Sequence, residues 1–308
     1  MNKVLFFRSI VLSCIILNVL FSCARKNEKL PGSAKAATRV DLSSDTSPEG
    51  MLFHYWYDFD FKDTIALRNP DIGEQHLVDF IARFPKFPDT TSSKAIKHML
   101  SKAKPFTISF EFFKQQYERY LYDPNSPMRN DLYYKPVLEF LLDSCRLSEA
   151  DKYIYSAQLA LIKKNNIGTP ALDFEFQIPT GEKRKISSAH APFVLLFFYE
   201  PGCPHCETAI EELRNSTGFS QLVNKGVMNV LAIYALGDHN VWQAYQSHIP
   251  ATWTNGFDSN KQVLAKGLYD IRASPTIYLL DKDKKVLLKD TDLSKVALYF
   301  NSQSSLNI

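Results

Sequence analysis

Apolar side chains follow two different periods along this chain, and the change between them falls near residue 166. Before that point, from about residue 49, large apolar residues recur at steps of three and four. One such stripe consists of Phe110, Phe113, Tyr117 and Tyr120. Steps of three and four place side chains on one face of a helix, so the pattern predicts a helical N-terminal part. Asp123-Pro124 is expected to end this helix.

Two further helices are expected in the same part of the chain. The second stripe follows Pro136, a residue suited to a first helical turn, and consists of Val137, Leu138, Leu141 and Leu142. Ser148 with Asp151 resembles a capping box and predicts the start of a third helix, which carries Ile154, Ala157 and Leu161. A small helical bundle follows from these elements. We interpret the aromatic stripe as core rather than as a ligand groove, and Cys145 as a buried apolar thiol.

Beyond the turn-forming residues 165–170, the pattern changes to short strands that alternate with helix-like segments. The predicted strands are 173–178, 193–199, 227–236, 273–280 and 286–288. The last two are separated only by a charged turn and should form a hairpin, before a final helix from about Leu293 to Phe300. Strands that alternate with helices predict an α/β sheet for this second part.

The first 22 residues combine a positive flank, Lys3 and Arg8, with an apolar run from Ile10 to Phe21. The run is too short to cross a bilayer comfortably, and the combination is typical of a secretion signal over residues 1–22. It ends in Leu-Phe-Ser-Cys, which resembles the bacterial lipobox and implies that Cys23 becomes the lipidated first residue. The alternative is an ordinary signal with an incidental cysteine. The polar residues 23–48 are expected to form a tether.

Composition indicates a globular protein and argues against two classes of partner. The chain has 308 residues, 45% of them apolar, which suffices for about two domains with real cores. The 36 Lys and Arg are interspersed with 33 Asp and Glu, for a net charge of +3, so no basic face for nucleic acid is indicated. Neither a P-loop nor a Gly-x-Gly-x-x-Gly motif is present, and nucleotide binding is therefore not supported.

The cysteines carry the chemistry that the sequence suggests. Cys14 lies in the signal and Cys23 would be acylated, which leaves three thiols, too few for a disulfide framework. Two of them, Cys203 and Cys206, have Cys-x-x-Cys spacing between a buried strand and a predicted helix. The unpaired N–H groups and the dipole at a helix N-terminus favour the thiolate of Cys203, and a protonated His205 would add to this effect.

Cys206, one helical turn further along, could attack a mixed disulfide on Cys203, which is dithiol–disulfide exchange. A metal site is not indicated, because a single Cys-x-x-Cys lacks the second pair of ligands for tetrahedral zinc. Glu207, rather than a histidine, follows Cys206 and excludes covalent haem attachment.

This motif and two flanking segments resemble the thioredoxin superfamily, in particular its exported branch of cytochrome-maturation and TlpA-like thiol–disulfide proteins. The similarity covers roughly Thr169 to Asn301 and includes the segment 168–174, the strand-Cys-x-x-Cys-helix unit and Ser274-Pro275-Thr276. It implies a thioredoxin-like domain over residues 167–308, a central mixed sheet flanked by helices. It also implies that Pro275 is cis and that, with Ser274, it shapes the site where a client peptide docks.

Two other segments also resemble parts of known proteins. Residues 238–257 are similar to the extra helix and strand that the exported branch inserts in the middle of the fold. Residues 49–166 resemble the uncharacterised helical domain that precedes thioredoxin-like domains in Bacteroidetes lipoproteins. This resemblance implies an all-α N-terminal domain, but no activity.

The sequence departs from the superfamily pattern around the cysteines. Gly202 replaces the usual Trp, which would widen access for a substrate. Phe197 stands where thioredoxin has a buried Asp that helps to deprotonate the second cysteine, and Glu200 could substitute for it if its carboxylate turned inward. Pro204-His205 is the dipeptide of oxidising DsbA-like proteins, whereas Ser274 is closer to the reducing branch, so the redox direction stays open.

These observations predict a protein-disulfide oxidoreductase anchored in the cell envelope by the lipid on Cys23 and facing the periplasm. Cys203 would attack and Cys206 would resolve, with support from Pro204, His205, Ser274, Pro275 and Glu200. The reaction would need no cofactor, and the partners would be exported thiol or disulfide proteins and a redox partner protein. Two alternatives remain: a peroxiredoxin-like peroxidase, although it would need Thr in place of Glu200, and a non-catalytic, redox-gated binding protein that uses the helical domain.

Overall fold

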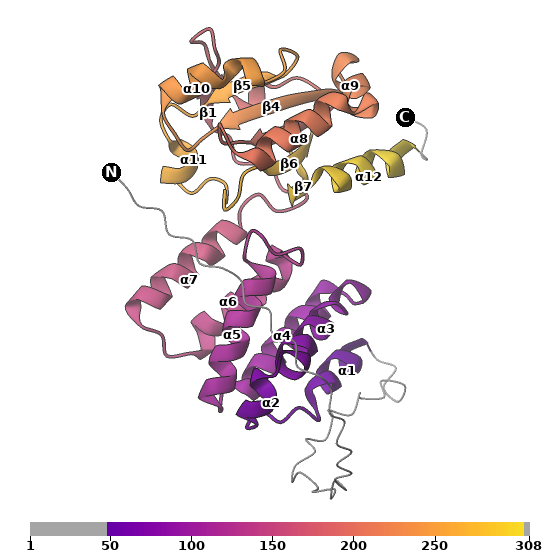
Figure 1. Cartoon of the computed structure of the whole chain (residues 1–308), viewed down its shortest axis with the longest axis vertical. Helices are drawn as coiled ribbons and strands as arrows, with labels where there is room; N and C mark the ends of the chain where they lie inside the picture. The colour runs from indigo at the N-terminus through magenta and orange to yellow at the C-terminus, as the bar shows by residue number, and fades with distance from the viewer. Residues whose placement is uncertain (1–47, 305–308) are drawn as a thin grey trace, which may run out of the picture. The chain divides into compact units, whose positions relative to one another are not determined.

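The computed structural model describes residues 48–304, in which a helical part is followed by a mixed sheet with flanking helices (Figure 1). This arrangement confirms the predicted fold class. The predicted signal (residues 1–22), Cys23 and the tether up to residue 47 lie outside the described residues. Within the described range, every helix is either too short or too polar to cross a membrane.

The helical part occupies the indigo to pink ribbon in Figure 1. Its α-helices are α1 (Pro48–Phe53), α2 (Thr64–Arg68), α3 (Gln75–Ile81), α4 (Asp89–Ala103), α5 (Thr107–Leu121), α6 (Asp131–Ser144) and α7 (Glu149–Ile162). Polar side chains fix several of their starts. Asp63 accepts hydrogen bonds from two backbone N–H groups of α2, and Ser148 accepts one from Asp151 in α7, as the capping pattern predicted.

The core of the helical part is rich in aromatic rings. The indole of Trp56 is buried and has ring-centroid distances of 5.1 to 5.8 Å to the rings of Phe59, Phe61, Phe80 and Phe113. Phe113 belongs to the stripe that the sequence showed, and Phe110 and Tyr117 of the same stripe are buried with it. The interpretation of this stripe as core is therefore confirmed.

Two details of the helical part differ from the predictions. Pro136 lies inside α6 rather than in its first turn, because Asn130 caps the helix and starts it at Asp131. A proline there leaves the carbonyl of Leu132 without its helical donor. In α7, the inward side chains are Tyr155, Leu159 and Ile162, whereas Ile154 and Ala157 are exposed. A stripe that starts at Tyr155 fits the sequence as well as the predicted stripe that starts at Ile154. In the structure, the larger Tyr155 side chain is buried and Ile154 is not.

The second part is built on a seven-stranded sheet with the order β2-β1-β5-β4-β3-β6-β7. The strands are β1 (Glu175–Gln177), β2 (Lys183–Lys185), β3 (Phe193–Phe198), β4 (Met228–Tyr234), β5 (Thr254–Phe257), β6 (Thr276–Asp281) and β7 (Val286–Thr291). β3 pairs in parallel with β4 and antiparallel with β6, so the sheet is mixed. β6 and β7 form the predicted hairpin.

Helices cover both faces of this sheet. On one face, Leu195 and Phe197 of β3 pack in a core with α8 (Pro204–Asn215), α9 (Thr217–Asn224), α10 (His239–Tyr245) and α12 (Leu293–Ser304). On the other, Val194 and Leu196 pack in a second core that includes α11 (Gln262–Ala265). A strand that is buried on both faces is apolar throughout, which explains the uninterrupted apolar run at this point of the sequence.

The residues between the two parts are held by hydrogen bonds. Asn165 adopts φ +49°, and its side chain donates to the carbonyl of Leu268 and accepts from the backbone of Leu172, both at 2.8 Å. Three residues further, the backbone N–H of Gly168 donates to the carbonyl of Val286, and the backbone N–H of Val286 donates to the carbonyl of Thr169. The chain therefore enters the sheet domain along a fixed path.

Candidate active site

Cys203 lies at the point where β3 leads into α8. It is the N-cap residue of this helix, and its carbonyl accepts a hydrogen bond from the backbone of Glu207 at 3.0 Å. Pro204 occupies the first helical position, where the missing N–H removes no helical hydrogen bond. Cys203 therefore lies at the N-terminus of α8, as the sequence predicted, although its sulfur accepts no capping hydrogen bond from the first turn.

Gly202, immediately before the motif, has φ +76°. This left-handed region favours glycine, and a Cβ placed there would find no atom within 4 Å. The backbone conformation of the turn thus accounts for a glycine at this position. The predicted widening of access depends on the side chain alone and stays a prediction.

The sulfur of Cys203 is half-buried and faces the segment that precedes β6. Its thiol donates a hydrogen bond to the carbonyl oxygen of Ser274, with a distance of 3.4 Å between Sγ and O. The Ser274–Pro275 peptide bond is cis, which confirms that expectation. The structure therefore brings together Cys203, Ser274 and Pro275, which lie about seventy residues apart in sequence.

Cys206 is fully buried, on the face of the sheet that carries α8. Burial raises the pKa of its thiol to about 12, and a hydrogen bond with the Cys203 side chain adds to the effect, whereas a backbone hydrogen bond with Glu200 opposes it. Because the thiolate is the nucleophile, Cys206 is unreactive in this state. The two cysteines thus differ in access and in proton affinity, although both are free thiols.

The other predicted supporting residues are at the surface. The side chains of Pro204 and His205 are exposed on the first turn of α8. Glu200 is exposed as well, so the condition under which it could substitute for the buried Asp, a carboxylate turned inward, is not met. β3 ends at Phe198, so Glu200 lies beyond the sheet, where water solvates its charge. Phe197 is buried and provides no carboxylate either.

A polar group that the sequence analysis missed lies in the same core as Cys206. The side-chain oxygen of Asn255, in β5, accepts hydrogen bonds from the hydroxyl of Tyr199 at 2.9 Å and from the indole of Trp242 at 3.0 Å. All three residues are buried. The sequence of β5, Thr-Asn-Gly-Phe, gives no signal that this amide is buried, and only the fold shows which donors it serves.

Tyr245 connects this group to the motif. Its ring stacks on that of Tyr199, with 5.8 Å between centroids, and its hydroxyl donates to the carboxylate of Glu207 at 3.5 Å. Burial raises the pKa of Tyr245 to about 12, with further contributions from Glu207 and Cys206. The environment of Cys206 is therefore lined by neutral phenols rather than by a buried carboxylate.

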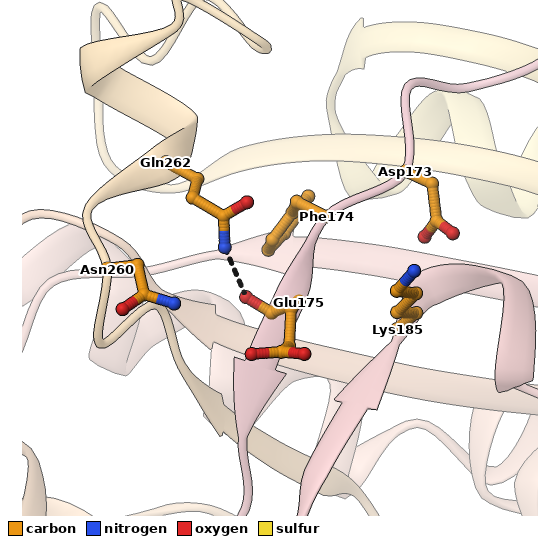
Figure 2. A pocket seen from close by; sticks show the side chains of 6 residues that line it. All are labelled: Asp173, Phe174, Glu175, Lys185, Asn260 and Gln262. Atoms are coloured by element: carbon orange, nitrogen blue, oxygen red, sulfur yellow. Dashed lines mark hydrogen bonds between the residues drawn. The ribbon is translucent and has the colours of Figure 1, made fainter.

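A separate hollow of about 290 Å³ lies between β1, β2 and α11. Figure 2 shows its lining, in which the side-chain amide of Gln262 donates to the carbonyl of Glu175 and the Lys185 side chain extends toward Asp173. Neither cysteine of the motif contributes to this hollow. Among residues 48–304, no group of three or more His, Cys, Asp or Glu side chains is arranged to hold a metal ion.

Comparisons with known proteins agree with this architecture. Residues 47–165 match the family described as a domain of unknown function, DUF5106, and residues 167–289 match the AhpC/TSA family. The chain is 36% identical to a thioredoxin-like protein from Bacteroides caccae whose crystal structure is known. That alignment covers 82% of this chain and 92% of the other, with a TM-score of 0.78. The chain belongs to the thioredoxin-like proteins.

Other solved structures match the present chain over shorter stretches. One is the C-terminal domain of an uncharacterized protein from Bacteroides fragilis, with 39% identity, coverage of 44% of this chain and 98% of that chain, and a TM-score of 0.44. Another is a domain of a "possible thiol-disulfide isomerase" from Cytophaga hutchinsonii, with 25% identity, coverage of 47% and 97%, and a TM-score of 0.42. No curated protein matches the chain.

Proposed function

We propose that this thioredoxin-like protein is a membrane-anchored thiol–disulfide oxidoreductase that acts on exported proteins through Cys203 and Cys206. The observation that carries the proposal is the asymmetry of the pair. Cys203 is half-buried at a helix N-terminus beside the Ser274 carbonyl, whereas Cys206 is fully buried and retains its proton. One sulfur can meet a client, and the other can be reached only through the first.

In the reducing direction, the thiolate of Cys203 attacks one sulfur of a client disulfide, and the other client sulfur leaves as a thiolate. Cys206 then loses its proton and attacks Sγ of Cys203, which releases the second client sulfur. The products are a Cys203–Cys206 disulfide and a client dithiol, so two electrons and two protons pass to the client. A reducing partner protein restores the dithiol, and the same steps in reverse oxidise a client.

The causes of the raised pKa of Cys206 fit this sequence of steps. Burial is the largest cause, but the hydrogen bond with Cys203 and the charge of its thiolate also raise the pKa. Both contributions from Cys203 disappear once that sulfur is bonded to a client. Cys206 therefore becomes more acidic at the step in which it must act as a nucleophile.

Membrane attachment rests on the first 48 residues. The sequence of the signal, Cys23 and the polar tether supports lipid anchoring in the cell envelope, with the domains facing the periplasm. Expression of a Cys23→Ser variant in a bacterium that processes lipoproteins tests this part. The variant should leave the detergent-soluble membrane fraction, and retention there would contradict the anchor.

Trapping of the mixed disulfide tests the chemistry. Cys206→Ser should accumulate a covalent adduct with a disulfide client such as insulin, and Cys203→Ser should form none and lose reductase activity. Full activity of Cys203→Ser would contradict the proposal. Consumption of hydrogen peroxide by the reduced protein, far above that of a thioredoxin control, would instead favour a peroxidase. A partner captured through residues 49–166 independently of both cysteines would favour a binding protein.

The direction of electron flow follows from the reduction potential of the Cys203–Cys206 couple in glutathione buffers. A potential near that of thioredoxin would assign a reductase, and one near that of DsbA-like proteins would assign an oxidase. The difference is measurable because about 30 mV corresponds to a tenfold change in the equilibrium constant of a two-electron couple.

A further inference from the structure

Six charged side chains form a buried network beside the segment that carries Ser274. We call it the boundary network, and its members are Arg129, Asp131, Asp270, Arg272, Lys289 and Asp290. Their side chains are only 6 to 19% exposed. Three are cationic and three anionic, so the formal charge of the network is zero. Two members belong to the helical domain and four to the thioredoxin-like domain.

Arg272 lies at the centre of this network. Its guanidinium donates to the carboxylate of Asp131 at 2.7 Å and to the backbone carbonyl of Tyr122 at 2.9 Å. It also lies 3.0 Å from the carboxylate of Asp270 and 4.0 Å from the centroid of the Tyr122 ring. A planar guanidinium can satisfy several partners in fixed directions at once, which a lysine ammonium cannot do. Arg272 is therefore held from several sides.

The position of Arg272 in the chain connects these contacts to the cysteines. Residues 270–275 have no regular secondary structure, so side-chain contacts determine their path. Ser274, two residues after Arg272, presents the carbonyl that accepts the hydrogen bond from the thiol of Cys203. Between them, the carbonyl of Ala273 accepts a hydrogen bond from the hydroxyl of Thr276 at 2.6 Å. The segment is thus fixed at Arg272 on one side and at β6 on the other.

We propose that Arg272 is a positioning residue through which Asp131 and Tyr122 of the helical domain set the reactivity of Cys203. This inference rests on the proposed function only because both concern the sulfur of Cys203. The hydrogen bond to Ser274 exists only while Cys203 is protonated, so a well-placed carbonyl favours the thiol over the thiolate. If the segment is released, the carbonyl moves away and the thiolate forms more readily. The helical domain thereby acts on the chemistry without contact with a client.

The test measures the rate of alkylation of Cys203 by iodoacetamide between pH 5 and pH 9, in a Cys206→Ser background of the mature chain. Arg272→Met removes every polar contact of the guanidinium at similar length. Asp131→Asn changes only the helical domain and is nearly isosteric, so it keeps the measurement interpretable if Arg272→Met does not fold. Lys164→Gln is the matched control, because the ammonium of Lys164 donates to the carbonyls of Lys266 and Gly267 across the same boundary, outside residues 270–275.

Arg272→Met should shift the alkylation profile to lower pH and raise the rate at pH 7 roughly threefold to tenfold, the factor that corresponds to one lost hydrogen bond. Asp131→Asn should shift it in the same direction by a smaller factor, and Lys164→Gln should stay within twofold of the parent. Arg272→Lys should restore the parent profile only in part.

Unchanged profiles in folded Arg272→Met and Asp131→Asn proteins would overturn the proposal, as would complete restoration by Arg272→Lys or an equal shift in Lys164→Gln. Alkylation reports on Cys203 directly and requires no client. A protein without oxidoreductase activity would therefore still give a clear result here, and the two proposals can fail separately.

Discussion

The thiol of Cys203 and the carbonyl oxygen of Ser274 lie 3.4 Å apart, on segments that the fold alone brings together. β3 delivers the cysteine to the N-terminus of α8, and the antiparallel neighbour β6 begins just after the serine. The pairing of these two strands therefore determines which backbone group the reactive sulfur meets.

The two cysteines should differ strongly in their reaction with an electrophile. At pH 7, a thiol with a pKa of about 12 has a thiolate fraction of only about 10⁻⁵, and Cys206 is also shielded from solvent. Iodoacetamide should modify Cys203 at least about a hundredfold faster than Cys206 in the folded protein. Peptide mass spectrometry after timed quenching measures both rates. If the two cysteines reacted at comparable rates in the native protein, and unfolding in urea did not change the ratio, Cys206 could not be shielded as the structure shows.

Asn255 should contribute strongly to stability. In an Asn255→Leu variant, the hydroxyl of Tyr199 and the indole of Trp242 lose their shared acceptor while they stay buried. We expect a loss of about 2 to 4 kcal/mol in the free energy of unfolding, because each unsatisfied buried donor costs about 1 to 3 kcal/mol. Urea denaturation followed by tryptophan fluorescence measures it. Asn260→Ala, in an exposed turn, is the control and should change stability by less than about 0.5 kcal/mol.

The pH dependence of stability should change when Asp270 is replaced. Burial raises the pKa of this carboxyl to about 6, with contributions from Asp131 and Asp290, whereas Arg272 and Lys289 oppose the increase. The folded protein therefore holds this proton at pH values where the unfolded chain has released it. The corresponding stability is fully present below about pH 3.8 and is lost as the pH rises through about 6.

An Asp270→Asn variant cannot titrate at this position. Relative to the parent, it should be less stable at pH 4 than at pH 7, by a difference on the order of 2 kcal/mol, since each pKa unit corresponds to about 1.4 kcal/mol. Denaturant titrations of both proteins at the two pH values give this difference. A stability difference that is the same at both pH values would show that Asp270 is ionised throughout.

Gly202 should resist replacement for conformational rather than steric reasons. A Cβ at this position meets no neighbour, but the φ of +76° is unfavourable for other residues. Gly202→Ala should destabilise the protein by about 1 kcal/mol. Gly218→Ala is the matched control, because Gly218 also has open space but lies in helix α9, where alanine should stabilise by up to about 1 kcal/mol. Thermal unfolding compares the two, and equal effects would contradict the conformational argument.

Local periodicity made much of the fold predictable. A pattern of a few residues was enough to predict burial in two places: the stripe of Phe110, Phe113 and Tyr117, and the apolar run of β3. β2 escaped prediction because Lys183, Arg184 and Lys185 are all exposed and carry no apolar pattern. It exists because β1 offers a hydrogen-bonding partner, which the local sequence cannot show.

The chemistry of the candidate site divides in the same way. The Cys-x-x-Cys spacing and the Ser-Pro-Thr segment were visible in the sequence, whereas the partners of Arg272 were not. A charged residue in a loop is expected to be solvated, and Arg272 finds Asp131 about 140 positions earlier. The sequence left open whether the carboxylate of Glu200 turns inward, and the end of β3 places it in solvent. Long-range pairing of polar groups requires the fold.

The unequal exposure of the two sulfurs also bears on survival under oxidative stress. An oxidant that enters from solvent meets Cys203 first, and the product, a sulfenic acid, forms within reach of the thiol of Cys206. Condensation of the two expels water and closes the Cys203–Cys206 disulfide, a species that the proposed catalytic cycle already contains. Under the proposed function, oxidation of Cys203 would thus end in a disulfide that a reductant can reduce again, before irreversible sulfinic acid accumulates.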